Sequence, residues 1–277
     1  MMCKKNSGFT LVEMLVALGL ASIISIAALK FYMAQNNNMI TQQNVSDMQQ
    51  NLRASMDAIS HELRNAGANL PDGLPAFVAS NANPDSVQVN YAPMNACLNV
   101  GDHVNKAKAN PVHIAIGSDM SMFHVGDNVS LWHASTKTIE NFTITKIATN
   151  SGVGWIEVHH QDADLKTDPV PGDLLINMRQ VKFFLNTADS THPKLMRQEN
   201  NGNADVFADN VDGLNVRYIR SGHDTVDVLA ASDTVHAVIL ALSAETNDKD
   251  YEGSRLGGQA RRKRTLTSNV VVRNQRF

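Results

Sequence analysis

The sequence predicts an α+β protein in which one long N-terminal helix packs on a β-rich, antiparallel globular head. No proline, and no glycine after Gly19, interrupts the chain until Gly67. One helix can therefore run from Phe9 to about Ala66, with that glycine as its C-terminal cap. Beyond Pro71 the helical period gives way to short alternating runs separated by Gly, Pro, Asn and Asp, which is the pattern of antiparallel strands.

The first part of this helix is apolar enough to span a membrane. From Phe9 to Leu29 the chain is an apolar run of about 21 residues, which as a helix would cross the roughly 30 Å hydrocarbon core of a bilayer. A secretory signal would instead end its apolar region at a small-residue cleavage site, so we expect processing before the run. Lys4 and Lys5 are the only charges ahead of it. The positive-inside rule then leaves the N-terminus in the cytoplasm and the head in the periplasm of a two-membrane bacterium.

These patterns divide the chain into four segments. We expect a leader peptide at residues 1–8, a membrane-spanning helix at 9–31, an amphipathic periplasmic helix at 32–69 and a β-rich head at 70–277. The 277 residues, 43% of them hydrophobic, suffice for one ordinary globular domain and an additional long element. The formal net charge of -3, which loss of the two leader lysines would make -5, gives no overall positive field for nucleic acid.

Glu13 is an acidic residue inside the apolar run. An ionised carboxylate at the centre of a membrane span costs roughly 2.5–3.5 kcal/mol, and such residues usually have a partner. The position of Glu13 near one end of the run lowers this cost. Two interpretations stay open: the carboxylate extends to the membrane interface, or it pairs with a charged group of another molecule.

The string from Lys4 to Glu13, KKNSGFTLVE, resembles the prepilin cleavage and methylation motif: a short basic leader ending in glycine, then phenylalanine, then an apolar run with glutamate at its fifth position. The resemblance implies that a membrane-embedded aspartyl peptidase cuts between Gly8 and Phe9 and methylates the new amino terminus at Phe9. It also implies that Glu13 pairs with the N-terminal amine of a neighbouring subunit during assembly. Such a pair would recover much of the desolvation cost and set the axial register.

The second half of the expected helix is amphipathic. Seven apolar residues recur at spacings of three and four, which places them on one face: Val45, Met48, Leu52, Met56, Ile59, Leu63 and Ala66. The polar residues are expected to point elsewhere: Asn44, Asp47, Gln50, Arg53, Asp57 and Glu62. We expect the apolar face to bury against the head; a coiled-coil seam is the alternative, although the pattern is short for one.

Eight segments of the head have the alternation and turn signals of strands. They are residues 86–91, 128–132, 138–145, 154–159, 174–184, 214–220, 235–242 and 266–272. No internal repeat is present. A β-rich domain with a helix laid across one sheet is therefore expected.

Two further strings narrow the resemblance. Leu63-Arg64-Asn65-Ala66-Gly67, at the end of an amphipathic helix, is similar to PilW-type minor pilins and their J-type relatives in type II secretion systems. The closing segment TSNVVVRN, residues 267–274, resembles the final strand of PilW-like proteins. Major pilins often have a proline partway along the helix and a C-terminal disulfide loop. This chain has neither feature, which favours a minor subunit.

The sequence contains no clear metal or catalytic motif. Ten histidines are present, but no pair has helical ligand spacing, and His159 and His160 must face opposite sides of a strand. The carboxylates of segment 159–168 have a composition that calcium favours, but the segment lacks the glycine and closing glutamate of an EF-hand loop, so we expect a solvated turn. No glycine-flanked serine nucleophile, phosphate-binding glycine loop or cysteine-histidine arrangement appears. We expect no cofactor and no enzymatic activity; a signal-anchored hydrolase with an unfamiliar site is the alternative class.

Cleavage at the motif would leave Cys97 as the single cysteine, because Cys3 lies in the leader. A lone cysteine in an exported protein forms no internal disulfide. We expect it to be buried and inert, since free cysteine packs as a small hydrophobe. Intermolecular pairing is the alternative.

A basic cluster stands out near the C-terminus of an otherwise acidic chain. It comprises Arg261, Arg262, Lys263 and Arg264. We expect an exposed loop or edge strand that charge protects against aggregation. DNA capture by a pilus tip is the alternative interpretation, but we do not expect nucleic acid to be a partner.

Together these observations predict a structural minor pilin that primes or caps a type IV pilus, with a J-type minor pseudopilin of a type II secretion system as the alternative. The resemblance implies as partners other minor pilins, the major pilin, prepilin peptidase, inner-membrane lipid and the assembly platform. It also implies a single-pass inner-membrane location before assembly and a pilus location, at the tip, afterwards.

Overall fold

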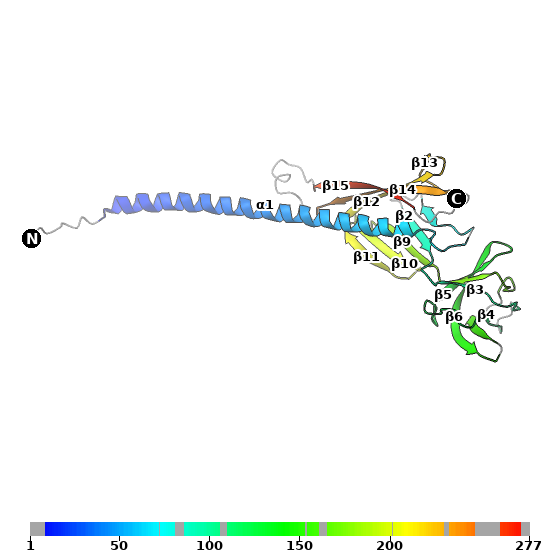
Figure 1. Ribbon diagram of the computed structural model, residues 1–277. Coiled ribbons are helices and arrows are strands. Elements are labelled where there is room, and N and C mark those ends of the chain that lie inside the picture. Colours follow the sequence, from blue (N-terminus) through cyan, green and yellow to red (C-terminus); the bar gives the residue numbers. More distant parts are fainter. Residues whose placement is uncertain are drawn as a thin grey trace, which may run out of the picture. The chain divides into compact units, whose positions relative to one another are not determined.

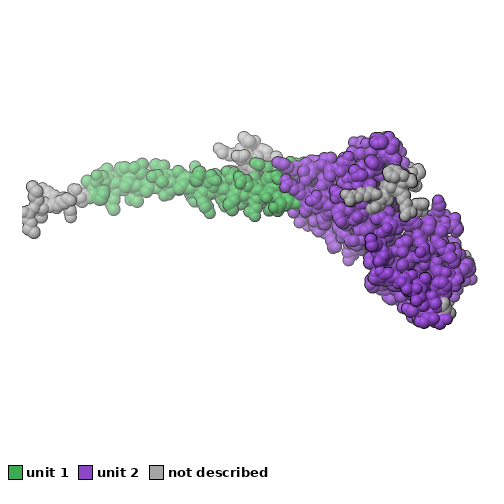
Figure 2. All heavy atoms as spheres, viewed as in Figure 1, with its two compact units in different colours: residues 1–50, 245–263 green, residues 51–244, 264–277 purple. Residues whose placement is uncertain are grey.

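The computed structural model describes residues 9–71, 73–80, 86–105, 110–152, 154–160, 165–200, 202–229, 233–246 and 261–272. The chain divides into two compact units (Figure 2): residues 1–50 with 245–263, and residues 51–244 with 264–277. Helix α1 (Leu11–Asn65) contributes residues to both units.

Helix α1 confirms the predicted long helix: it is continuous over 55 residues. Glu13 lies in its first turn and Arg64 in its last, where each charge complements the helix dipole. Residues 11–36 are exposed throughout. Within the described residues, α1 is the helix long and apolar enough to cross a membrane, judged by length and composition.

Gly67 ends the helix as predicted. It adopts a left-handed conformation, with φ of 74°, which a residue with a Cβ atom adopts only with strain. Its backbone N–H donates to the carbonyl of Asn90 at 2.9 Å, and the N–H of Ala92 donates to the carbonyl of Ala68, also at 2.9 Å. The turn after α1 is therefore hydrogen-bonded to the segment that contains Asn90 and Ala92.

Two antiparallel sheets lie in the second unit with the last turns of α1 (Figure 1). The five-stranded sheet has the order β1-β2-β9-β10-β11, with β1 at Phe77–Ser80, β2 at Ser86–Tyr91, β9 at Arg179–Asn186, β10 at Lys194–Glu199 and β11 at Ala204–Asp209. The four-stranded sheet has the order β13-β12-β14-β15, with β12 at Val211–Arg220, β13 at Thr225–Val226, β14 at Val235–Glu245 and β15 at Lys263–Val271.

A six-stranded sheet forms an inserted lobe, which we define as residues 92–178. Its order is β3-β8-β5-β6-β7-β4, with β3 at Cys97–Asn99, β4 at Val112–Ala115, β5 at Asn128–His133, β6 at Thr138–Asn150, β7 at Trp155–His160 and β8 at Leu174–Ile176. Strands β2 and β9 are direct neighbours in the five-stranded sheet, where Tyr91 pairs with Arg179. The inserted lobe is therefore placed between two adjacent antiparallel strands.

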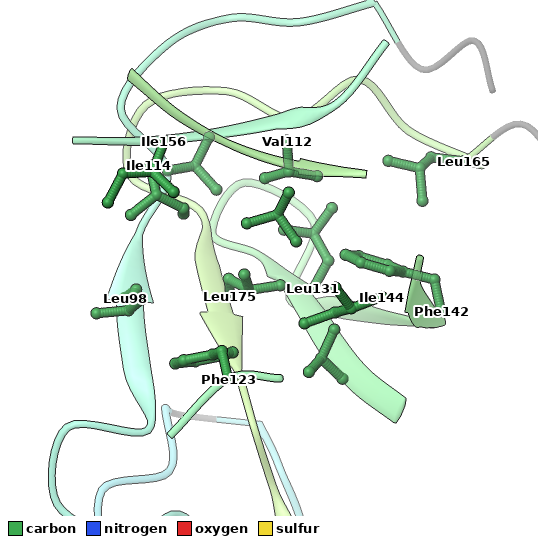
Figure 3. Close-up of a cluster of buried hydrophobic side chains, with 13 residues drawn as sticks. Leu98, Val112, Ile114, Phe123, Leu131, Phe142, Ile144, Ile156, Leu165 and Leu175 are labelled. Atoms are coloured by element: carbon green, nitrogen blue, oxygen red, sulfur yellow. The ribbon is translucent and has the colours of Figure 1, made fainter. Parts of the chain in front are cut away.

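The inserted lobe has its own hydrophobic core. Leu131, Ile114 and Leu175 are fully buried in it, and Phe142 and Phe123 pack at its margins (Figure 3). These residues come from β4, β5, β6 and β8 and from the segment before β5. The alternation of buried and exposed residues along β7 shows one face of this sheet turned to the core.

Most predicted strands are confirmed, and one prediction was wrong. Residues 174–184 were expected to form one strand, but they form β8 and the first part of β9, which belong to different sheets. The chain breaks at Asn177, whose side-chain amide donates to the Met122 carbonyl and the Asp127 carboxylate. Six short strands were not predicted: β1, β3, β4, β10, β11 and β13.

The apolar stripe of the second half of α1 is buried as predicted from Met48 onward, whereas Val45 is half-buried. Leu52, Ile59 and Leu63 are at most 1% exposed, and Met56 is 7% exposed. Glu62 is a correction: it was expected to point away from the apolar face, but it is 9% exposed. The reason is that its carboxylate has two partners on the five-stranded sheet, Tyr91 and Arg197.

A buried group of three titratable side chains fixes a loop of the inserted lobe. His133 is 1% exposed, and its Nδ1 lies 2.8 Å from an Asp173 oxygen while its Nε2 lies 3.0 Å from a Glu140 oxygen. Backbone N–H groups of Lys166 and Thr167 donate to Glu140, and those of Ala134 and Val170 donate to Asp173. Segment 165–173 is thereby held against β5 and β6.

We predict that His133→Ala destabilises the inserted lobe by about 3–5 kcal/mol, because it leaves two buried carboxylates without the side chain between them. Both tryptophans of the chain, Trp132 and Trp155, lie in the lobe, so urea unfolding followed by tryptophan fluorescence measures the effect. His192→Ala is the control, since His192 is half-exposed and pairs with Asp189 on the same turn. Its effect should stay within about 0.5 kcal/mol. Equal effects of the two substitutions would contradict the prediction.

Candidate functional site

The predicted processing motif lies at the N-terminal end of the chain, just before and in the first turn of α1. Gly8, Lys4 and Lys5 lie outside the described residues. Phe9 is the first residue described, and it is 91% exposed. It precedes the helix by two positions, so the residue expected to carry the new amino terminus stands at the free end of α1.

Thr10 and Glu13 form a capping box. The backbone N–H of Thr10 donates to Glu13 Oε2 at 2.9 Å, and the Thr10 hydroxyl donates to the same oxygen at 3.0 Å. In return, the backbone N–H of Glu13 approaches Thr10 Oγ1 at 3.3 Å. This arrangement satisfies donors that a helix N-terminus otherwise leaves unpaired. In the separate chain the Glu13 carboxylate is therefore bound to its own helix end.

This capping box was not predicted, although its signal is present in the sequence. Thr10 and Glu13 have the Thr-x-x-Glu spacing that marks a helix start. Hydroxyl groups farther along the run are satisfied internally as well: Ser22 donates to the Gly19 carbonyl and Ser25 to the Ala21 carbonyl, both at 2.8 Å.

A second group of charged residues joins the end of α1 to the five-stranded sheet. The Tyr91 hydroxyl donates to Glu62 Oε2 at 2.9 Å, and the Arg197 guanidinium lies 3.5 Å from Glu62 Oε1. Arg197 also pairs with Glu199 at 3.0 Å, and Arg179 Nε lies 2.7 Å from the other Glu199 oxygen. The Arg179 guanidinium sits 5.9 Å from the centroid of the Tyr91 ring.

This network compensates the burial of Glu62. A buried carboxylate is costly unless it is paired and hydrogen-bonded, and here a hydroxyl and a guanidinium fulfil both conditions. Tyr91 is 7% exposed. Burial, together with the hydrogen bond to Glu62, raises the pKa of Tyr91 to about 12. The network therefore links the last turns of α1 to β2, β9 and β10.

The basic cluster lies at the start of β15. Lys263 and Arg264 are its first two residues, and both are exposed, as is Arg262; Arg261 is half-buried. β15 is an edge strand of the four-stranded sheet. The backbone N–H of Arg262 donates to the Thr246 hydroxyl at 3.1 Å. The cluster is thus located on an edge strand and the segment before it, one of the two placements expected from the sequence.

The remaining candidate residues belong to the inserted lobe. Cys97 lies on the edge strand β3 and is half-buried rather than fully buried. Burial raises the pKa of the Cys97 thiol, which disfavours the reactive thiolate.

His160 is buried and His159 is half-exposed, so the two face opposite sides of β7 as predicted. Among the described residues no three His, Cys, Asp or Glu side chains are placed to hold a metal ion. Residues 161–164 of the carboxylate-rich segment lie outside the described residues.

Comparison with known proteins gives one match, and it covers only the N-terminal part of the chain. A family model described as the prokaryotic N-terminal methylation motif matches residues 3–29. No curated protein and no solved structure matches the chain. The matched residues include Phe9, Thr10 and Glu13 and extend over the apolar run. This match supports a type IV pilin-like or pseudopilin-like protein that is anchored in a membrane by α1 and later packed in a filament.

We predict that the contribution of Tyr91 to stability depends on pH. Below pH 10 the hydroxyl is protonated in both states, and Tyr91→Phe should cost about 1–2 kcal/mol through loss of the hydrogen bond to Glu62. Between pH 10 and 12 the unfolded tyrosine ionises while the folded one keeps its proton, so the unfolded state gains stability. The difference in unfolding free energy between the wild type and the Phe variant should therefore shrink as pH rises through this range. Denaturant titrations at a series of pH values measure it, and a constant difference would contradict the prediction.

Proposed function

We propose that this chain is a structural, non-enzymatic minor pilin that primes or caps a type IV pilus. The observation that carries the proposal is the methylation motif at residues 3–29, of which residues 11–29 form the exposed apolar start of a 55-residue helix. An exposed apolar helix needs lipid or other helices around it. A pilin uses both in turn: the membrane before assembly and neighbouring helices in the filament.

In this proposal the leader is removed between Gly8 and Phe9 by prepilin peptidase, and Phe9 becomes the methylated amino terminus. Glu13 then has two possible partners. In the separate chain its carboxylate accepts hydrogen bonds from Thr10. In the filament it would pair with the N-terminal amine of a neighbouring subunit, where low dielectric strengthens the attraction. Lys4 and Lys5 would keep the leader in the cytoplasm before cleavage.

The size of the head supports a tip or priming role over a role in bulk polymer. Large heads are sterically awkward in a repeating shaft. The inserted lobe adds residues 92–178 to the five-stranded and four-stranded sheets. The partners are then other minor pilins, the major pilin and the assembly platform in the inner membrane. The resemblance of Leu63 to Gly67 and of the final strand to PilW-type proteins supports this assignment within the pilin class.

A J-type minor pseudopilin of a type II secretion system is the second candidate. The observation in its favour is the same ending of the helix, since J-type subunits resemble PilW-type pilins there. Both candidates require leader cleavage and helix packing. The identity of the neighbouring genes would separate them most cheaply.

We predict that the mature chain begins with N-methylated Phe9, which mass spectrometry of the intact protein measures. Gly8→Val should block cleavage and leave the precursor in the membrane. Glu13→Ala should be cleaved normally but reach the sheared filament fraction at least about tenfold less, because it cannot pair with the incoming amine. Asp57→Ala is the matched control, since Asp57 is an exposed carboxylate on the same helix. An untrimmed wild-type start, or normal incorporation of Glu13→Ala, would refute the proposal.

The proposed location makes a separate prediction. Immunogold labelling with antibodies against the head should mark the ends of pili, with few particles along the shaft. Labelling along the whole shaft would contradict a priming or capping role. Wild-type pili labelled with the same antibodies after adsorption to the purified protein serve as the control for antibody specificity.

A further inference from the structure

The six-stranded sheet of the inserted lobe closes into a barrel. Val100, the residue after β3, forms an antiparallel bridge with Ile114 in β4, and the backbone N–H of Gly101 donates to the His113 carbonyl at 2.8 Å. The two ends of the strand order β3-β8-β5-β6-β7-β4 are thereby joined. Every one of these strands contributes side chains to the core (Figure 3). The alternate side chains of each strand therefore point out of the barrel.

The barrel contacts the turn after α1 through one side. The outward side chain of Ile176 in β8 is fully buried in a cluster with Leu70, and Trp132 of the neighbouring β5 packs against the same cluster. Around the closed barrel, β7 is three strands away from β8 in either direction. The outer side of β7 is therefore opposite the side that packs against this turn.

The outer side of β7 and its two neighbouring strands combines an aromatic ring with hydrogen-bonding groups. His113 of β4 pairs in register with Glu157 of β7, and Asn150 of β6 pairs with Trp155 of β7. We define the Trp155 face as these four residues and His159, the next outward residue of β7. All five side chains are half-buried, so each keeps an accessible part while its neighbours restrict its movement.

Two neighbours hold the Trp155 indole in position. The ring lies against Gly101, where a Cβ atom would come within 2.3 Å of the indole Cζ3. The His113 ring is nearly parallel to the indole, with an interplanar angle of 9° and 6.1 Å between the ring centroids. Asp102 orients His113 in turn, since its carboxylate lies 3.7 Å from Nδ1. An aromatic ring that is held in advance loses little conformational entropy when it binds a ligand.

The polar side chains beside the ring orient one another. Asn150 Nδ2 donates to Glu157 Oε1 at 2.8 Å, and His159 Nε2 lies 3.6 Å from Glu157 Oε2. The side chain of Glu157 is 20% exposed and that of His159 is 29% exposed. The amide oxygen of Asn150 and the remaining lone pairs of the Glu157 carboxylate can accept further hydrogen bonds. The Trp155 face therefore presents oriented acceptors next to an apolar ring.

This combination fits a neutral saccharide. A sugar ring has a face of C–H groups that packs on an aromatic ring, and its hydroxyl groups donate to carboxylate and amide oxygens. A polyanion fits poorly, because Glu157 is acidic and the inserted lobe contains nine acidic residues against five lysines and no arginine. An apolar peptide or a lipid chain also fits poorly, because the indole is the one large apolar group of the Trp155 face.

We propose that the Trp155 face binds a neutral saccharide chain. The Trp155 indole packs against the C–H face of one sugar ring, and Glu157 and Asn150 accept hydrogen bonds from its hydroxyl groups. His113 acts as a positioning residue that orients the indole. This binding activity goes beyond the proposed structural function and does not depend on it.

Calorimetric titration with cellohexaose, an uncharged β-linked glucose oligomer, tests the proposal. The full chain is used, in a detergent without a sugar headgroup. The wild type should bind, and Trp155→Ala should weaken binding at least about tenfold, because the ring supplies most of the apolar contact. Trp155→Phe should stay within about threefold of the wild type, since it keeps an aromatic ring.

Two histidine variants form a matched pair. His159 and His124 each lie 3.6 Å from a carboxylate of the inserted lobe, but His124 is outside the Trp155 face. We expect His159→Ala to weaken binding about threefold or more, because Glu157 loses a group that orients it, and His124→Ala to stay within about 1.5-fold of the wild type. Urea unfolding of each variant checks that it is folded.

The outcomes that would overturn the proposal are distinct. No binding by the wild type up to about 10 mM cellohexaose would overturn it, and so would equal affinities of the wild type and Trp155→Ala. Binding of a single-stranded oligothymidine in place of cellohexaose would overturn it as well, because the Trp155 face would then take polyanions. If Trp155→Ala does not fold, the comparison of His159→Ala with His124→Ala decides. All of these outcomes leave the proposed function standing, since incorporation into filaments is measured separately.

Discussion

Burial of the last turns of α1 is the constraint on which the rest of the head depends. Leu52, Ile59 and Leu63 are almost fully removed from solvent, and each buried side chain of this size contributes roughly 1.5–3 kcal/mol. In the five-stranded sheet, Tyr91 donates a hydrogen bond to the buried Glu62 carboxylate and Arg197 forms an ion pair with it. The final turns of α1 and the turn at Gly67 are therefore held to the five-stranded sheet by polar contacts as well as by apolar burial.

The sequence predicted the long helix well, because its signals are local. The absence of proline, the left-handed glycine at 67 and the apolar spacing from Leu52 to Ala66 each identify a feature that the structure contains. The longer strands were predicted for the same reason: their alternation extends over enough residues to be seen. Short strands such as β3 and β13 depend on the partner strand more than on their own residues, so no local pattern marks them.

The candidate functional residues at the start of α1 could be predicted from the sequence, whereas the contacts of those near its end could not. Phe9 and Glu13 follow from a contiguous string, and the bond between Thr10 and Glu13 could have been read from their spacing. Glu62 could not have been placed, because its partners Tyr91 and Arg197 come from distant parts of the sequence. The same holds for His133, whose two carboxylate neighbours are 7 and 40 residues away. Long-range pairing of polar groups has no periodic signature.

The insertion of the lobe between β2 and β9 determines where a pulling force on the lobe acts in the five-stranded sheet. Both ends of the lobe enter the five-stranded sheet at the same place, beside the pair Tyr91 and Arg179. A load pulling on the lobe would separate these two strands from that end, one hydrogen-bonded pair after another, rather than shearing them along their length. The contact of the Arg179 guanidinium with the Tyr91 ring spans β9 and β2 at this first point of separation, so it is among the first contacts to resist such a load.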